Sequence, residues 1–378
     1  MRLFFDHMRT ERFQVRNFIN GEFVEPISGR YLDNVEPATG KPYSHVADSD
    51  AHDVDLAVAA AEKAFRDWSK KTAAERSNFL LRIAELIERD LEKFARAESV
   101  DTGKPISLAR TLDIPRSIAN FRFFATAILH TESEAHITDN VAFNYTLRQP
   151  RGIAGLISPW NLPLYLLSWK IAPAIAVGNT AIAKPSELTP MTAYMLCEIA
   201  REAGLPHGVL NVVHGRGPNV GAPITAHPKI NTISFTGGTV TGRKVAEACA
   251  PLFKKVSLEL GGKNPNIIFA DADLAAAIAG SVRSSFANRP HTAPACTRAR
   301  EGKGSASVST GLQPAFAIRQ SKTTARSCEA LPQPTEWQHI GNQINAAFIF
   351  ARADFKNVCV PAFALAHLIT ACHKPRCF

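Results

Sequence analysis

The sequence predicts an α/β fold built on a doubly wound, mostly parallel sheet, followed by a largely irregular C-terminal tail. Three observations favour this class. Short apolar runs alternate with helical stretches from Gly152 onward, and such alternation implies right-handed crossovers between parallel strands. Polar and glycine-rich motifs directly follow the apolar runs. A chain of 378 residues with 46% hydrophobic content can also bury a large core.

The first 130 residues predict short strands followed by three helices. The strands are expected at 17–24 and 31–35, and Asn20-Gly21 predicts a tight hairpin turn within the first of these stretches. Asp50 or Asp53 is the expected N-cap of the first helix. The helices are expected where apolar residues recur at helical spacing, at 53–68, 73–99 and 114–130. We interpret them as packing elements.

Five buried parallel strands are expected in the next part of the chain. They lie at 153–158, 180–184, 209–213, 232–236 and 256–260. The helices between them are expected at 165–176, 189–203, 220–226 and 241–250. Doubly wound sheets bind ligands at the carboxyl ends of their strands, which is where each motif below is found.

The segment from Arg289 differs in composition from the residues before it. It holds 11 Lys and Arg against 4 Asp and Glu, so most of the formal net charge of +9 lies there. Five of the 7 cysteines also follow Asn288. Neither the helical nor the strand period is clear before Ile340. This composition predicts a mostly unstructured tail at 289–378.

Charge and cysteine use limit the classes of partner and compartment. The residues up to Asn288 are nearly neutral, which argues against nucleic acid as a partner. Cys197 and Cys249 lie in apolar helical stretches and are expected to be reduced core thiols. The N-terminus lacks a continuous apolar segment, and prolines and Lys170 interrupt the apolar stretch 157–183. We therefore expect a cytoplasmic protein with no secretory signal and no membrane partner.

Polar side chains follow the first two strands of this series. Asn161, in the loop Ser158-Pro159-Trp160-Asn161, can donate a hydrogen bond to an oxyanion as it forms. The alternative is an Asn that braces its own loop. Lys184 and Glu187 follow the next strand, where a cation and a carboxylate can bracket the hydroxyls of a ribose. A solvent-facing ion pair explains this second motif equally well.

Glycines and a carboxylate follow the last two strands. Gly237, Gly238 and Gly242 open a helix, whose free N–H groups and partial positive charge suit a diphosphate. Because the G-x-x-x-x-G spacing departs from the usual dinucleotide motif, a structural turn is the alternative. Glu259 precedes two glycines that leave space for a general base to reach water or a thiol. A carboxylate that accepts backbone N–H bonds is the alternative there.

Taken in this order, the four motifs resemble the NAD(P)-dependent aldehyde dehydrogenase superfamily, most closely through Leu258-Glu259-Leu260-Gly261-Gly262-Lys263-Asn264-Pro265. The resemblance runs from about Asn17 to Asn288. It implies an enzyme that oxidises an aldehyde to a carboxylic acid, with Asn161 as oxyanion donor and Glu259 as general base. NAD is favoured over NADP, because a carboxylate at 187 accepts from a free 2′-hydroxyl and repels a 2′-phosphate. The residues that the resemblance assigns to the cofactor are Ser158, Trp160, Lys184, Ser186, Glu187, Gly217, Gly221, Phe235, Gly237, Gly238 and Leu260.

The resemblance also implies how the chain is divided. Residues 17–130 and 151–259 would form the NAD-binding domain, and 131–150 would supply strands to an oligomerisation region. The catalytic domain would begin at 260–288. Residues 1–16 would be an N-terminal extension, and 289–378 would lie outside the family pattern. A homo-oligomer is expected from the family, although the C-terminal strand that pairs its subunits is not found here.

A finer likeness is to the branch that acts on 2-aminomuconic and 2-hydroxymuconic semialdehydes. It rests on Asp101-Thr102-Gly103-Lys104-Pro105, on Asp113-Ile114-Pro115-Arg116 and on 120–124. Those substrates carry a carboxylate, which an Arg can bind bidentately, so Arg116 is the candidate substrate contact. A helix-surface salt bridge is the alternative for Arg116, and betaine-aldehyde-type relatives also fit the pattern.

The nucleophile of the family pattern is missing. Its segment has the form F-x-N-x-G-[Q/E]-x-C, and this chain begins it with Phe286-Ala287-Asn288 but carries Ala293 at the Cys position. Cys296 comes three residues later, and a displacement of even about 1 Å can lower a rate on the order of 10²-fold. Two hypotheses remain: an NAD-dependent aldehyde dehydrogenase that uses Cys296 or a refolded tail, or an inactive nucleotide-binding relative that is truncated or frameshifted. The second is favoured, with an out-of-frame, intronic or alternatively spliced tail as its cause.

The tail predicts no other functional site. Its His and Cys residues do not have the spacing of a zinc site, so no metal is expected; they are Cys359, His367, Cys372, His373 and Cys377. Its basic residues lack the interleaved aromatic side chains of a single-strand nucleic-acid site. The partner expected for the chain is therefore a small-molecule aldehyde.

Overall fold

The structure is a computed structural model that describes residues 13–262, 268 and 271–286. Several sequence predictions lie outside these residues. They concern most of the N-terminal extension, Ala293, Cys296, the His and Cys residues after 358 and the tail as a whole.

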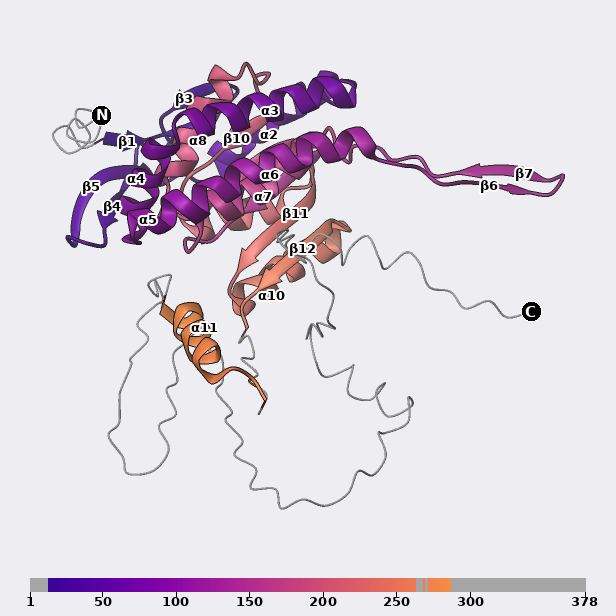
Figure 1. Cartoon of the computed structure of the whole chain (residues 1–378). Helices are drawn as coiled ribbons and strands as arrows, with labels where there is room; N and C mark the ends of the chain where they lie inside the picture. The colour runs from indigo at the N-terminus through magenta and orange to yellow at the C-terminus, as the bar shows by residue number, and fades with distance from the viewer. Residues whose placement is uncertain (1–12, 263–267, 269–270, 287–378) are drawn as a thin grey trace. The chain divides into compact units, whose positions relative to one another are not determined.

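A seven-stranded sheet forms the centre of the fold, in the order β12-β11-β8-β9-β10-β2-β3 (Figure 1). Its five parallel strands are β8 (Ile153–Ile157), β9 (Thr180–Lys184), β10 (Leu210–Val212), β11 (Ile230–Gly237) and β12 (Lys255–Leu260). From β8 the chain runs outward through β9 and β10, then returns to place β11 against the other side of β8. This order confirms the predicted doubly wound class and puts the switch point between β8 and β11.

Helices cover both faces of this sheet. One face carries α7 (Pro163–Ala176) and α8 (Met191–Glu202), and the other carries α2 (Ala51–Trp68), α9 (Ala222–Ala226) and α10 (Thr239–Cys249). The side chains of β8 alternate between the two cores, with Ala154 and Leu156 in one and Ile153 and Ile157 in the other. Burial on both faces explains why β8, β9 and β10 appear in the sequence as short apolar runs. β12, which was expected to be buried as well, is mostly exposed among the described residues.

The N-terminal strands extend the sheet beyond β10. β2 (Asn17–Ile19) pairs antiparallel with β10, and β3 (Glu22–Val24) pairs antiparallel with β2. Asn20 and Gly21 join them with φ values of 53° and 83°, as the predicted tight turn requires. A Cβ at Gly21 would lie 2.6 Å from the ring of His207, so the turn has no room for a side chain there.

The helix predicted at 73–99 is wrong in one respect, because the structure has two helices there. α3 (Ala73–Arg89) ends and α4 (Leu91–Thr102) begins at Asp90, whose φ and ψ are −101° and 18°. The Asp90 carboxylate accepts from Arg89 at 2.6 Å and lies 2.9 Å from the Lys93 ammonium. Apolar positions continue on both sides of the break, so periodicity does not reveal a change of direction confined to one residue.

The helix predicted at 53–68 begins slightly earlier, at Ala51. Asp50 is its N-cap, and Asp53 closes a capping box with it. The helix predicted at 114–130 is α6 (Ile114–Ala127), continued by the 3-10 turn η2 (Ile128–His130), and α3 and α6 lie side by side (Figure 1). Cys197 and Cys249 are buried free thiols, as expected.

Strands outside the central sheet were only partly predicted. β4 (Tyr31–Glu36) was expected, but neither its partner β5 (Lys41–Ala47) nor β1 (Phe13–Val15), which pairs with β5, was. Residues 131–150 contain the two-stranded hairpin β6 (Ala135–Thr138) and β7 (Ala142–Tyr145), which extends beyond α6 in Figure 1. The remaining elements are α5 (Ile106–Leu108), η1 (Ala109–Asp113), η3 (Gly217–Gly221), η4 (Ala250–Leu252) and α11 (Leu274–Phe286). None of the helices in the described ranges has both the length and the apolar character needed to cross a lipid bilayer.

Candidate functional site

The strand register brings the predicted motifs to one edge of the sheet. Ile157 of β8 is paired with Lys184 of β9 on one side and with Phe235 of β11 on the other. Further along, Thr236 and Gly237 of β11 are paired with Glu259 and Leu260 of β12. The motifs after four adjacent strands therefore share the carboxyl-end edge at the topological switch point, where ligands of such sheets bind.

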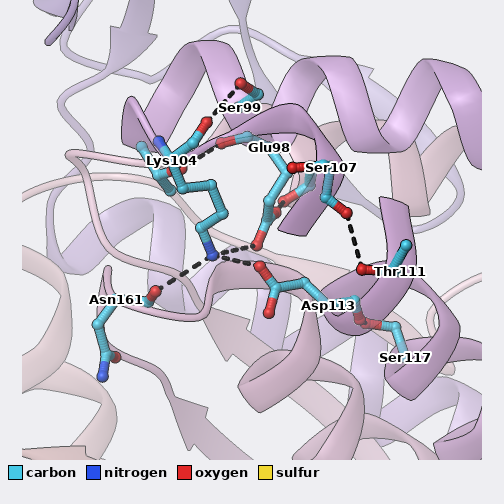
Figure 2. Close-up of polar contacts among 10 residues, drawn as sticks. Glu98, Ser99, Lys104, Ser107, Thr111, Asp113, Ser117 and Asn161 are labelled. Atoms are coloured by element: carbon cyan, nitrogen blue, oxygen red, sulfur yellow. Dashed lines mark hydrogen bonds and ion pairs between the residues drawn. The ribbon is translucent and has the colours of Figure 1, made fainter. Parts of the chain in front are cut away.

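The loop after β8 contains buried polar atoms without partners. The Ser158 N–H donates to the Lys184 carbonyl at 3.2 Å, but its buried hydroxyl has no partner among the described residues. Asn161 Oδ1 is likewise buried without a hydrogen bond to a described residue. The Asn161 carbonyl accepts from Lys104 Nζ at 3.4 Å, and its amide points away from that lysine (Figure 2). Unpaired buried polar atoms call for a functional explanation, and this amide does not brace its loop through Oδ1.

Lys184 and Glu187 form a partly buried ion pair. Lys184 Nζ lies 2.8 Å from Glu187 Oε2, with exposed side-chain fractions of 5% and 30%. The alternative of a solvent-facing pair therefore fails for the lysine. Ser186 is buried beside them, and its hydroxyl accepts from the Leu188 N–H at 3.3 Å. Only the carboxylate of this group is accessible enough to meet a polar ligand directly.

A histidine that sequence reasoning missed lies close to Lys184. His214 follows β10 and is 1% exposed, and neither ring nitrogen has a hydrogen-bond partner among the described residues. Burial, reinforced by the positive charge of Lys184, lowers the pKa of His214 to about 3. The imidazole is therefore neutral at physiological pH. No motif marks His214 in the sequence, because its environment depends on Lys184, which lies thirty residues earlier in the chain.

The glycines after β11 lie where a helix begins. Gly238 is the N-cap of α10, with φ −70° and ψ 148°, and no side chain caps this end. A Cβ at Gly238 or Gly217 would meet nothing within 4 Å, whereas one at Gly237 would lie 2.5 Å from the Phe235 ring. Gly238 and Gly217 thus leave open space beside free N–H groups, and Gly237 is required by packing against Phe235.

The carboxylate after β12 is exposed and close to a buried lysine. Glu259 is exposed, and a Cβ at Gly261 or Gly262 would meet no described atom within 4 Å. Lys170 of α7 donates to Ser234 Oγ at 2.9 Å. Burial lowers the pKa of Lys170 to about 8, and the negative charge of Glu259 opposes that shift. In the sequence, the only sign of a distinct environment for Lys170 was its position within an otherwise apolar helix.

The remaining site candidates are more widely spread. Trp160 is half-buried in the Asn161 loop, Gly221 is buried at the end of η3, and Leu260 is exposed at the end of β12. Arg116 is half-buried in the first turn of α6 and makes no salt bridge with a described residue. The surface salt bridge considered for it is therefore not formed with the described part of the chain. Within that part, no three His, Cys, Asp or Glu side chains are grouped to hold a metal ion.

Comparison with known proteins points to one family. Residues 23–300 match the model of the aldehyde dehydrogenase family, beyond the Asn288 boundary expected from the sequence. The chain is 55% identical over 276 residues to the 2-aminomuconic semialdehyde dehydrogenase of Danio rerio, covering 73% of this chain and 56% of that protein. It is 48% identical over 281 residues to the 2-hydroxymuconic semialdehyde dehydrogenase of Pseudomonas sp. (strain CF600), covering 73% of this chain and 58% of that protein.

A solved structure gives the same result. The NAD+ complex of an aldehyde dehydrogenase from Bacillus cereus superposes with a TM-score of 0.71 at 40% identity, over 74% of this chain and 57% of that one. The chain thus spans little more than half the length of the proteins that it matches. The family match, the identity to these relatives and the shared fold agree, and the chain belongs to the aldehyde dehydrogenase family.

Proposed function

We propose that this chain binds NAD at the carboxyl-end edge of its sheet and carries two groups for the oxidation of an aldehyde to a carboxylic acid. The observation that supports the proposal best is the convergence of four motifs, after β8, β9, β11 and β12, at the switch point. A structural turn or a lone ion pair would explain one motif, but would not explain their common location.

The residues present fit a dinucleotide. The Glu187 carboxylate, held by Lys184 at 2.8 Å, can accept hydrogen bonds from ribose hydroxyls. The uncapped start of α10 at Gly238 offers N–H groups and a partial positive charge to a diphosphate. The unpartnered Ser158 hydroxyl provides a further polar contact. When bound, NAD supplies the acceptor for the hydride that leaves the substrate.

Asn161 and Glu259 would act on the substrate itself. The Asn161 amide can donate to the substrate oxygen as it becomes negative. Glu259, exposed at the end of β12, can take a proton from a thiol or from the water that releases the acid. The negative charge of Glu259 raises the pKa of Lys170 against the larger effect of burial.

The substrate proposed is a semialdehyde that also carries a carboxylate. Its support is the identity to semialdehyde dehydrogenases of two types and the availability of Arg116 for a bidentate contact. Betaine-type aldehydes carry no carboxylate that Arg116 could bind. The proposed division into a cofactor domain, a hairpin for subunit contact at 131–150 and the start of a catalytic domain after Glu259 follows the family resemblance of the sequence.

Turnover depends on a thiol that the sequence does not place at the family position, where Ala293 stands. We therefore propose that the chain binds NAD without turnover. The second candidate is a working enzyme that uses Cys296.

Calorimetry of NAD binding, combined with an assay of NADH formation from a carboxylated semialdehyde, tests both candidates. Saturable binding without NADH supports the first. NADH formation that is lost in C296A supports the second and contradicts the first. Absence of NAD binding to the folded chain would refute both.

A further inference from the structure

A buried lysine connects the N-terminal helices to the loop that carries Asn161. Lys104 is 1% exposed, and its ammonium faces three acceptors (Figure 2). It donates to Asp113 Oδ2, lies 3.6 Å from Glu98 Oε1, and donates to the Asn161 carbonyl at 3.4 Å. Two of these contacts are hydrogen bonds, and the one to Glu98 is an ion pair.

The backbone of Lys104 is itself fixed. α4 ends at Gly103, which adopts a φ of 68°. The Ser99 hydroxyl donates to the Lys104 carbonyl at 2.7 Å, and the Lys104 N–H donates to Thr102 Oγ1 at 3.3 Å. The lysine side chain therefore extends from a fixed origin, and the position of its ammonium is set by α4.

Charge compensation alone does not explain the third contact. A buried ammonium needs anionic partners, and Glu98 and Asp113, both 0% exposed, supply them. The Asn161 carbonyl comes from a loop 57 residues further along the chain. Within that loop, Asn161 Oδ1 is unpartnered among the described residues.

We propose that Lys104 is a positioning residue for Asn161. Its ammonium holds the peptide group between Asn161 and Leu162 and so determines where the Asn161 amide points. This inference rests on the proposed role of Asn161 as an oxyanion donor. Such a donor is effective only when it is held in place before charge develops, and a small displacement lowers the rate steeply.

The position of the amide can be observed without turnover or ligand. The full chain is labelled with [15N]asparagine, and the side-chain signals of Asn161 are identified by their loss in N161S. In K104M we expect those signals to move by more than their linewidth, while the signals of Asn120, whose amide donates to Ser168 Oγ at 2.9 Å on α7, stay in place. The matched control E98Q alters the same cluster but leaves the Lys104 contact to Asn161, so its Asn161 signals should match those of the unmodified chain.

A second variant covers the case in which K104M does not fold. K104M/E98Q/D113N removes all three charges together, which a protein interior tolerates better than one unpaired charge, and it should displace the Asn161 signals equally. Unchanged Asn161 signals in either folded lysine variant would overturn the proposal, as would an equal displacement in E98Q. Because these signals are read in the ligand-free chain, their outcome is independent of whether NAD binds or NADH forms.

Discussion

At the scale of single residues, the site depends on a few charges whose environments differ. Lys184 is buried, and the Glu187 carboxylate that it holds is partly accessible. Lys170 is buried beside exposed Glu259 and has a pKa lowered to about 8. Lys184 holds the orientation of the accessible Glu187 carboxylate, whereas Lys170 donates to Ser234 and is affected by Glu259 only through its charge. In both cases the carboxylate is the group that a ligand meets.

The Glu187 carboxylate is predicted to set both the affinity for NAD and the preference over NADP. We expect E187Q to weaken NAD binding by about 10- to 100-fold, because a hydrogen bond to a charged group contributes about 1.5–3 kcal/mol. Binding of NADP should weaken less, since the repulsion of its 2′-phosphate is removed as well.

Calorimetry with both dinucleotides measures the two effects. The matched control is E62Q, which removes an exposed carboxylate that is paired with Lys229 at 2.7 Å. Glu62 is far in sequence from the strand ends that carry the proposed NAD contacts. Equal losses for NAD and NADP in E187Q, or a loss in E62Q, would contradict the role given to Glu187.

At the scale of elements, α4 carries an unusual amount of buried acid. Glu98 and Asp101 are fully buried on one side of this helix, and burial is the main cause that raises the pKa of Glu98 to about 7 and of Asp101 to about 6. Lys104 opposes the shift at Glu98, and a hydrogen bond from Tyr43 opposes it at Asp101. These carboxyl groups therefore hold protons more tightly in the folded chain than in the unfolded chain.

The contribution of Glu98 to the free energy of unfolding is predicted to fall as pH rises from about 4.5 to about 7. Within that range Glu98 binds a proton more tightly in the folded chain than in the unfolded chain, so its stabilisation is complete at low pH and is lost as pH rises. The Glu98 contribution is on the order of 2–3 kcal/mol.

Urea unfolding at several pH values, compared between the unmodified chain and E98Q, checks this sign. The amide of E98Q cannot ionise, so its stability should decline less over the same range. A decline in E98Q as steep as that of the unmodified chain, or steeper, would show that the pKa of Glu98 is not raised.

Sequence patterns predict helices and strands well where buried apolar positions recur regularly along the chain. They predict an element or a residue's environment poorly where it depends on a contact with a residue that is distant in the sequence. β8, β9 and β10 are buried on both faces, so short apolar runs were enough to find them. β5 reads Lys-Pro-Tyr-Ser-His-Val-Ala, with neither alternation nor a continuous run, and was missed. Lys104, Lys170 and His214 owe their environments to partners on other elements, which no local pattern shows. Asn161 and Glu259 were found because their motifs resemble a family.

At the scale of the whole described chain, apolar surface is concentrated on the β6–β7 hairpin. Ile137, Val141 and Phe143 are 73%, 81% and 65% exposed. Exposed apolar groups of this size mark surfaces that bind a partner or aggregate. The hairpin lies in the segment for which the sequence predicts subunit contact.

Self-association through this hairpin is the corresponding prediction. We expect the double variant I137E/F143E to shift the sedimentation profile of the chain toward the monomer, because charged side chains disfavour burial in an apolar contact. The matched control I27E adds a charge at a residue that is 56% exposed elsewhere and should leave the profile unchanged. Identical profiles for all three proteins would exclude the hairpin as the contact.

The hairpin β2–β3 has a consequence for how the chain acquires its fold during synthesis. Its inner strand, β2, pairs with β10, and the Asn20 N–H donates at 3.0 Å to Asn211, 191 residues later. A ribosome therefore releases this hairpin long before its docking strand exists. Contacts so distant along the chain slow folding, so the sheet can close on that side only after β10 has been synthesised. Until then, the native partners of this hairpin are those closer to it in sequence, such as Ser49 and Asp53.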